Sequence, residues 1–173
     1  FEVGDEKPDL VIVNTCTVTS KAEQKARRMI RLFAAKCPVL VTGCYAQMAA
    51  NEIEGLASNV VVLPLARKPE LLSLSQFLGD RFCENSQPIL LEALREFASL
   101  KVPLGENRSK ENRFDYAPSG FTYHCRSYLK VQDGCDNNCG YCRVHIARGP
   151  SSFLNADTAV KRALEIESHG YHE

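Results

Sequence analysis

The chain has 173 residues, of which 45% are apolar and 24% charged, a balance typical of a soluble globular protein and not of a disordered one. No apolar run approaches the roughly 20 residues that span a bilayer, and no signal peptide is recognisable, so we expect a cytoplasmic protein with no membrane partner. The 21 basic and 21 acidic residues cancel, which argues against a wholly basic nucleic-acid binder. The eight cysteines are too few for a disulfide scaffold and favour a reduced protein that uses some thiols as metal ligands.

The first eighty residues alternate strand and helix patterns. Continuous apolar runs predict strands that are buried on both faces of a parallel sheet, at 10–13, 39–42 and 60–63. Helices are expected from Ser20 through Ala34, over about 46–53, and over 71–78. A capping box of Ser20 and Glu23 opens the first helix. This order predicts an α/β fold in which residues 1–80 form a three-layer domain with a parallel sheet and right-handed crossovers.

The middle of the chain, residues 81–123, loses this rhythm. A helix is expected over 88–100, and a polar linker follows at 105–120. The alternating pattern at 126–131 predicts a strand that leads into a second ordered unit, over 124–173.

This second unit ends in an expected helix. Asn155 is its predicted N-cap, the helix runs to about His169, and Gly170 stands at its C-terminal end. The apolar face of the helix needs a sheet to cover, so the chain is expected to stop inside a β-α-β unit.

Three cysteines of the second unit, Cys135, Cys139 and Cys142, have C-x3-C-x2-C spacing; we call them the triad. Loops of this kind hold iron–sulfur clusters through thiolates, and Gly134 and Gly140 allow tight backbone turns. Three thiolates for four irons leave one iron open, and an open iron is where chemistry can take place.

A structural zinc site is the alternative, with His124, Cys125 or His145 as the fourth ligand. Zinc sites usually use paired C-x2-C knuckles, whereas the triad has one such pair and an offset third thiol. A bacterial ferredoxin needs C-x2-C-x2-C spacing, and the first gap of the triad is one residue longer. The spacing therefore favours an open iron–sulfur site over both.

Two further cysteines, Cys16 and Cys44, each follow the carboxyl end of an expected strand. Neighbouring parallel strands lie about 4.8 Å apart, so both thiols would project into one crevice at the sheet edge where α/β proteins place their sites. Two thiols hold a cluster poorly, and a third from a strand before residue 1 would complete the set. Taken singly, such a cysteine is commonly a small buried hydrophobe.

Taken together, these motifs resemble a known family. The triad, with Tyr141 before its last cysteine, resembles the radical S-adenosylmethionine enzymes. Adding the cysteine-bearing stretches of the first domain, the chain resembles the methylthiotransferase family over nearly its whole length. The matching stretches are 11–19, 41–47, 129–142 and 147–150.

This resemblance implies two 4Fe–4S clusters and the cofactor S-adenosylmethionine. The triad would hold the cluster whose open iron chelates S-adenosylmethionine and splits it to a 5′-deoxyadenosyl radical. Tyr141 would pack beside the adenine, the alternative being a plain core aromatic. Cys16 and Cys44 would be two of the three ligands of an auxiliary cluster that donates the sulfur. Residues 124–173 would begin a partial (β/α) barrel of the radical type.

The stretch 121–133 is most similar to the branch that acts on threonylcarbamoyladenosine beside the tRNA anticodon, forming its 2-methylthio derivative. The expected partners are then the anticodon loop of tRNA and an electron donor such as flavodoxin or ferredoxin. Rivals within the family modify isopentenyladenosine in tRNA or an aspartate of a ribosomal protein. A rival of another class is a non-catalytic zinc-binding interaction module.

The chain opens at Phe1 without an initiator methionine, so we expect a piece of a longer protein. By the resemblance, the first auxiliary ligand would precede Phe1, and most of the barrel and an RNA-binding module would follow Glu173. We expect the piece to be inactive on its own.

The remaining charged residues and cysteines receive simpler predictions. The basic residues that flank the triad are the expected tRNA contacts, namely Arg126, Lys130, Arg143 and Arg148. The basic residues expected on a solvated helix face are Lys21, Lys25 and Arg28. Cys37 is expected to pack in the core, and Cys83 and Cys125 to be free thiols.

Overall fold

The fold begins with a parallel sheet whose strands follow one another in chain order. The structure is a computed structural model that describes residues 7–79, 87–100, 113–114 and 126–173. Its sheet has the order β1-β2-β3, with the strands β1 (Val11–Thr15), β2 (Val39–Gly43) and β3 (Val60–Val62). The parallel sheet is thus confirmed, and each strand ends within two residues of its predicted bounds.

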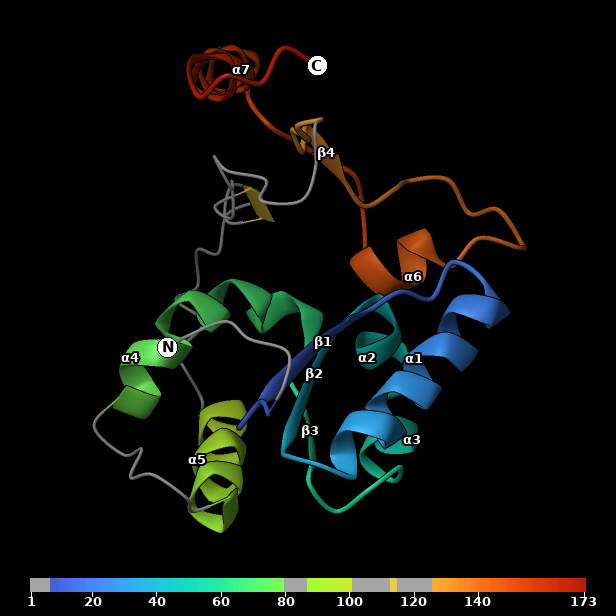
Figure 1. The fold of residues 1–173 in the computed structure, drawn as a ribbon. Coiled ribbons are helices and arrows are strands. Elements are labelled where there is room, and N and C mark those ends of the chain that lie inside the picture. Colours follow the sequence, from blue (N-terminus) through green and yellow to red (C-terminus); the bar gives the residue numbers. More distant parts are fainter. Residues whose placement is uncertain (1–6, 80–86, 101–112, 115–125) are drawn as a thin grey trace.

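Helices cover both faces of this sheet (Figure 1), which confirms the three layers. One face carries α1 (Ser20–Ala34), α2 (Cys44–Met48) and α3 (Ala50–Glu54). The other carries α4 (Leu71–Gly79), which follows the 3-10 helix η1 (Leu65–Glu70), and α5 (Gln87–Ser99). The central strand is buried on both sides, since Val39 and Val41 pack toward α1 while Leu40 packs toward α4 and α5.

Two local predictions in this part are wrong. The helix expected over 46–53 is interrupted at Ala49, whose φ of −137° and ψ of 43° end α2 before α3 begins. The N-cap of α1 is Thr19, whose hydroxyl accepts a hydrogen bond from the amide of Ala22. Glu23 does not complete a box with Ser20, because its carboxylate accepts a hydrogen bond from the hydroxyl of Thr17 instead.

The second part has a different architecture. Its strands β4 (Gln132–Asp133) and β5 (Ser152–Phe153) pair antiparallel, and between them lies α6 (Val144–Arg148). The strand expected over 126–131 is wrong, because the backbone is in a ladder only where the short β5 lies opposite it. The closing helix α7 (Ala156–Ser168) is confirmed, with Asn155 as its N-cap.

Some predictions fall on other parts of the chain. The linker at 105–120 lies almost wholly outside the described residues, as do Cys83, His124 and Cys125. Within the described ranges, no helix is long and apolar enough to cross a membrane.

Candidate functional site

The first group of the site lies at the carboxyl edge of the parallel sheet. Thr15 at the end of β1 is in register with Gly43 at the end of β2. Cys16 and Cys44 are the next residues on the two strands, so they leave the sheet at the same edge, as predicted. Cys44 is 8% exposed, whereas Cys16 is exposed and accepts a hydrogen bond from the amide of Val18 at 3.5 Å.

Two features lock this edge together. The buried hydroxyl of Thr15 donates to the carbonyl oxygen of Thr42 at 2.7 Å and accepts from the amide of Ala46 at 3.1 Å. Gly43 has a φ of 104°, and a Cβ atom at that position would overlap the backbone of Thr15. Only glycine therefore brings β2 this close to β1 and still turns the chain into α2 at Cys44.

The second group is the loop that carries the triad, between β4 and α6. Gly134 has a φ of 73° and lies against the carbonyl group of Pro150, and the amide of Cys135 donates to the carbonyl oxygen of Gly149 at 3.1 Å. These contacts close the base of the loop. At its tip Cys139 is exposed, while Cys135 and Cys142 are half-buried.

Tyr141 lies on this loop and is 92% exposed. The alternative of a plain core aromatic is therefore wrong for this structure. Its ring is accessible to a ligand, and its proposed role beside an adenine stays a prediction.

Helix α6 connects the two groups, because it packs against α2 at the sheet edge (Figure 1). At the N-terminal end of α6, Nη1 of Arg143 donates to the carboxylate of Glu23 at 2.5 Å and to the hydroxyl of Thr17 at 3.4 Å. At its last residue, Nε of Arg148 donates to Sγ of Cys44 at 3.2 Å. The segment that carries the triad is thus docked on the segment that carries Cys44.

An aspartate balances the charge at this junction. Asp133 is paired with Lys130 at 3.0 Å and with Arg148 at 3.2 Å, and its side chain is only 12% exposed. Burial by itself would raise the pKa of Asp133, but the hydrogen bond from Lys130 and the two nearby cations outweigh it and lower the pKa overall. The carboxylate is therefore ionised and holds the guanidinium of Arg148 in place.

Lys68 borders the same junction from η1. Its amino group donates to the side chain of Asn14 at 3.3 Å. Burial is the main cause that lowers the pKa of Lys68, and the neighbouring cations Lys130 and Arg148 lower it further. The sheet edge beside Cys44 is therefore a basic and partly desolvated environment.

The chemistry of these donors fits thiolate-bound iron–sulfur clusters. All six cysteines within the described ranges are free thiols, and five of them lie in the two groups just described. Iron–sulfur clusters are held by such thiolates. In the part of the chain that the structure covers, no three His, Cys, Asp or Glu side chains lie close enough together to hold a metal ion. The triad would therefore have to close around its cluster, and the ligand assignments stay predictions.

The flanking bases are all engaged in ion pairs. Besides the pairs already given, Arg126 contacts Glu173 at 2.6 Å. Their proposed contacts with tRNA remain predictions, and they would require these charges to leave or share their present ion pairs.

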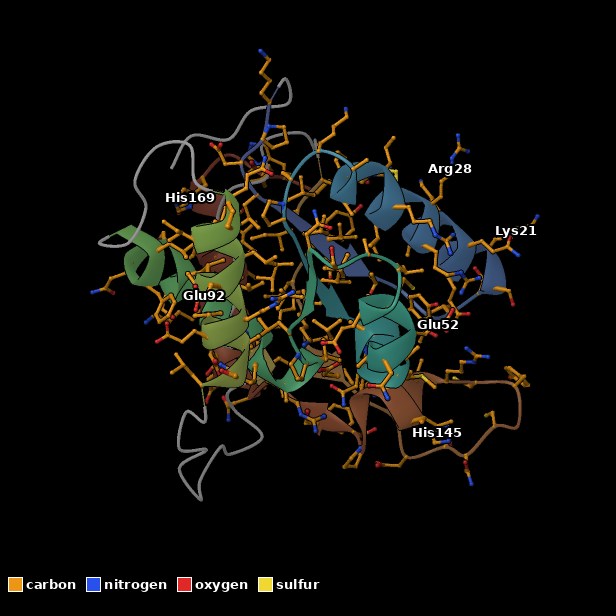
Figure 2. All side chains as sticks on the ribbon, turned by 90° about the horizontal axis from the view of Figure 1, so that it is seen from below. Lys21, Arg28, Glu52, Glu92, His145 and His169 are labelled. Atoms are coloured by element: carbon orange, nitrogen blue, oxygen red, sulfur yellow. The ribbon has the colours of Figure 1, made fainter. Side chains whose placement is uncertain are left out.

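The solvated face of α1 is confirmed, since Lys21, Lys25 and Arg28 are exposed, and Lys21 and Arg28 point away from the protein body (Figure 2). Cys37 is fully buried, as expected.

Two functional features were not predicted. The contact between Arg148 and Cys44 joins residues 104 positions apart. The run 147–150 was noted only as a stretch that matches the family, and it does not indicate this contact. Asp133 was not singled out either, although its place between two bases and before Gly134 is visible in the sequence. His145 (Figure 2) lies on α6, which packs against α2, and its Nδ1 is buried with no hydrogen-bond partner among the described residues.

The fold and the two groups of thiols define a mixed α/β protein with cysteines at a sheet edge and on a neighbouring loop. Comparison with known proteins narrows this class. Residues 2–63 match the uncharacterized protein family UPF0004.

The chain is 32% identical to a threonylcarbamoyladenosine tRNA methylthiotransferase of Treponema pallidum, over 95% of the chain and 43% of that protein. It is 29% identical to the enzyme of the same name from Bacillus subtilis, over 98% of the chain and 35% of that protein. It is 31% identical to a ribosomal protein uS12 methylthiotransferase of Carboxydothermus hydrogenoformans, over 99% of the chain and 36% of that protein.

The chain is thus related to the methylthiotransferases, and the predicted resemblance is confirmed at the level of the family. It spans 35–43% of the length of these three relatives.

Proposed function

We propose that the chain is part of a radical S-adenosylmethionine methylthiotransferase that modifies N6-threonylcarbamoyladenosine in tRNA, next to the anticodon, to its 2-methylthio derivative. The observation that carries the proposal is the docking of α6 on α2, because it brings the triad segment against Cys44. An enzyme that inserts sulfur at a radical site needs both centres beside one substrate.

The residues of the chain would have distinct roles in this enzyme. The triad would hold the cluster that binds S-adenosylmethionine, and Tyr141, with its exposed ring, would contact the adenine. Cys16 and Cys44 would be ligands of the auxiliary cluster. Bound in this way, the two clusters would supply the electron that cleaves S-adenosylmethionine and the sulfur that is inserted.

The choice of tRNA as substrate is part of the proposal. The tRNA enzyme of Treponema and the ribosomal-protein enzyme of Carboxydothermus are almost equally similar to the chain, at 32% and 31% identity. The similarity of 121–133 to the threonylcarbamoyladenosine branch and the bases beside the triad favour tRNA. We propose the anticodon loop as the partner, a flavodoxin or ferredoxin as the electron donor, and residues 124–173 as the start of a partial (β/α) barrel.

Iron and sulfide analysis of the anaerobically purified product of the complete gene tests the cofactor. We expect a brown protein that loses one cluster when the triad is replaced by alanine. The matched control is Cys37→Ala, which removes a buried thiol outside both groups and should keep both clusters. A colourless protein with stoichiometric zinc would establish the zinc-binding module instead.

Mass spectrometry of tRNA nucleosides from a strain that lacks the gene tests the substrate. We expect loss of the 2-methylthio group from threonylcarbamoyladenosine alone. Loss from isopentenyladenosine, or loss of the modification from a ribosomal protein with tRNA unchanged, would assign the chain to one of the rival branches.

A further inference from the structure

We propose that Arg148 is a positioning residue for the auxiliary cluster, and that its hydrogen bond to the sulfur of Cys44 raises the reduction potential of that cluster. The inference rests on the proposed function, because it takes Cys44 as a cluster ligand. It adds a link between the two centres, since the donor belongs to the triad segment and the acceptor to the parallel sheet.

The contact is direct and buried on the sulfur side, while the side chain of Arg148 remains 42% exposed. Nε of Arg148 lies 3.2 Å from Sγ of Cys44, and Cys44 is only 8% exposed. The guanidinium of an arginine is effectively always protonated, so the donor carries a full positive charge. A charged donor in a partly desolvated position interacts more strongly with a thiolate than a neutral donor in water does.

The guanidinium is held on its other side as well. Its Nη1 contacts Asp133 at 3.2 Å, and Lys130 fixes the same carboxylate at 3.0 Å. Asp133 belongs to β4, which β5 pins, and Gly149 ends α6 directly after Arg148 with a φ of 76°. Arg148 is thus oriented from two sides before any cofactor binds.

Such a donor has a known physical effect on an iron–sulfur cluster. Hydrogen bonds to the sulfur ligands and nearby positive charge stabilise the reduced, more negative state, and so raise the reduction potential. The neighbouring basic residue Arg143 directs its guanidinium elsewhere, since its Nη1 donates to Glu23 and Thr17. Arg143, directly before α6, is therefore assigned to docking of the helix, and Arg148, its last residue, to tuning of the potential.

A redox titration monitored by electron paramagnetic resonance tests the proposal. The complete gene product is used, with the triad replaced by alanine so that only the auxiliary cluster contributes to the signal. We expect Arg148→Gln to shift the potential to a more negative value, and Arg148→Lys, which keeps the charge without the planar donor, to shift it less. Arg143→Gln is the matched control and should leave the potential unchanged.

Each outcome decides the question. An unchanged potential in loaded Arg148→Gln, or an equal shift in Arg143→Gln, would overturn the inference and leave the proposed function intact. If the protein with the triad replaced by alanine binds no cluster, while the parent with an intact triad binds one, the auxiliary site is overturned and the inference with it. If Arg148→Gln loads no cluster, the potential of Arg148→Lys decides, and a value equal to that of the parent with all other conditions matched contradicts the role of the directional hydrogen bond.

Discussion

The sheet edge and the triad loop are built in opposite ways. Cys16 and Cys44 are fixed by strand register, by the buried hydroxyl of Thr15 and by a glycine that admits no side chain. The triad lies on a loop that is closed at its base by Gly134, with an exposed Cys139 at its tip. One group of thiols is held by the core of the fold, and the other lies on a loop whose exposed tip carries Cys139.

This difference teaches where the chain tolerates change. A side chain at the sheet edge contributes both to folding and to the site. Its loss should therefore lower the stability of the whole protein, in addition to any effect on the site. A side chain at the loop tip contributes to the site alone. The predictions below test that separation, beginning with the variant that should destabilise the protein most.

Gly43→Ala should lower the free energy of unfolding by about 3 kcal/mol, because the new Cβ meets the backbone of Thr15 at a φ of 104°. Urea unfolding followed by circular dichroism measures the change. The control is Gly79→Ala, where the added Cβ meets open space and the change should stay within about 1 kcal/mol. Equal effects of both variants would break the comparison.

Thr15→Val should cost about 2 kcal/mol, because it leaves the buried carbonyl of Thr42 and the amide of Ala46 without the Thr15 hydroxyl. Thr42→Val offers a control one residue from the same edge, since in the part of the chain that the structure describes the hydroxyl of Thr42 is buried without a partner. That second substitution should be neutral or stabilising. The midpoints of urea unfolding, at an unchanged slope, distinguish the two outcomes.

Gly134→Ala should change the global stability less, by about 1 kcal/mol, while it abolishes iron loading of the triad. The reason is that the added Cβ collides with the carbonyl group of Pro150 and opens the base of the loop. Gly140→Ala lies in the same loop with open space around it and should load iron normally. If Gly134→Ala lowers the free energy of unfolding as much as Gly43→Ala does, the stability of the protein depends on the loop as strongly as on the sheet edge, and the comparison fails.

The smallest effect concerns pH and the buried thiol of Cys37. Burial is the main cause that raises its pKa, and nearby Asp9 adds to it. The folded state therefore holds the thiol proton more tightly than the unfolded state, so this contribution to stability is complete below the unfolded pKa and is lost as the pH rises through the folded one. Unfolding free energies between pH 8 and pH 10.5 should fall more steeply for the parent than for Cys37→Ala. Parallel slopes would contradict the assignment.

The sheet could be predicted because its signals are local. Strands that are buried on both faces must be apolar throughout, and the runs 10–13, 39–42 and 60–63 fall within two residues of β1, β2 and β3. Parallel pairing then places the residues after each strand at one edge, so the position of Cys16 and Cys44 followed from the strand assignment alone.

The failures have physical causes that local patterns do not contain. The backbone at Ala49 leaves the helical region although the residue itself favours helix. The alternation over 126–131 predicted a strand, but a ladder forms only where a partner lies, and β5 is two residues long. The contact of Arg148 with Cys44 depends on how two distant segments dock, and no spacing within either segment encodes it.

The strand order has a consequence for how the protein is made. Because β1, β2 and β3 lie side by side in the order of the chain, each strand can pair with its predecessor as it leaves the ribosome, without waiting for a later segment to insert between them. Domains generally fold from the N-terminal side during synthesis, at about 5 to 20 residues per second. The thiols of the sheet edge can thus be in place several seconds before the triad has been translated.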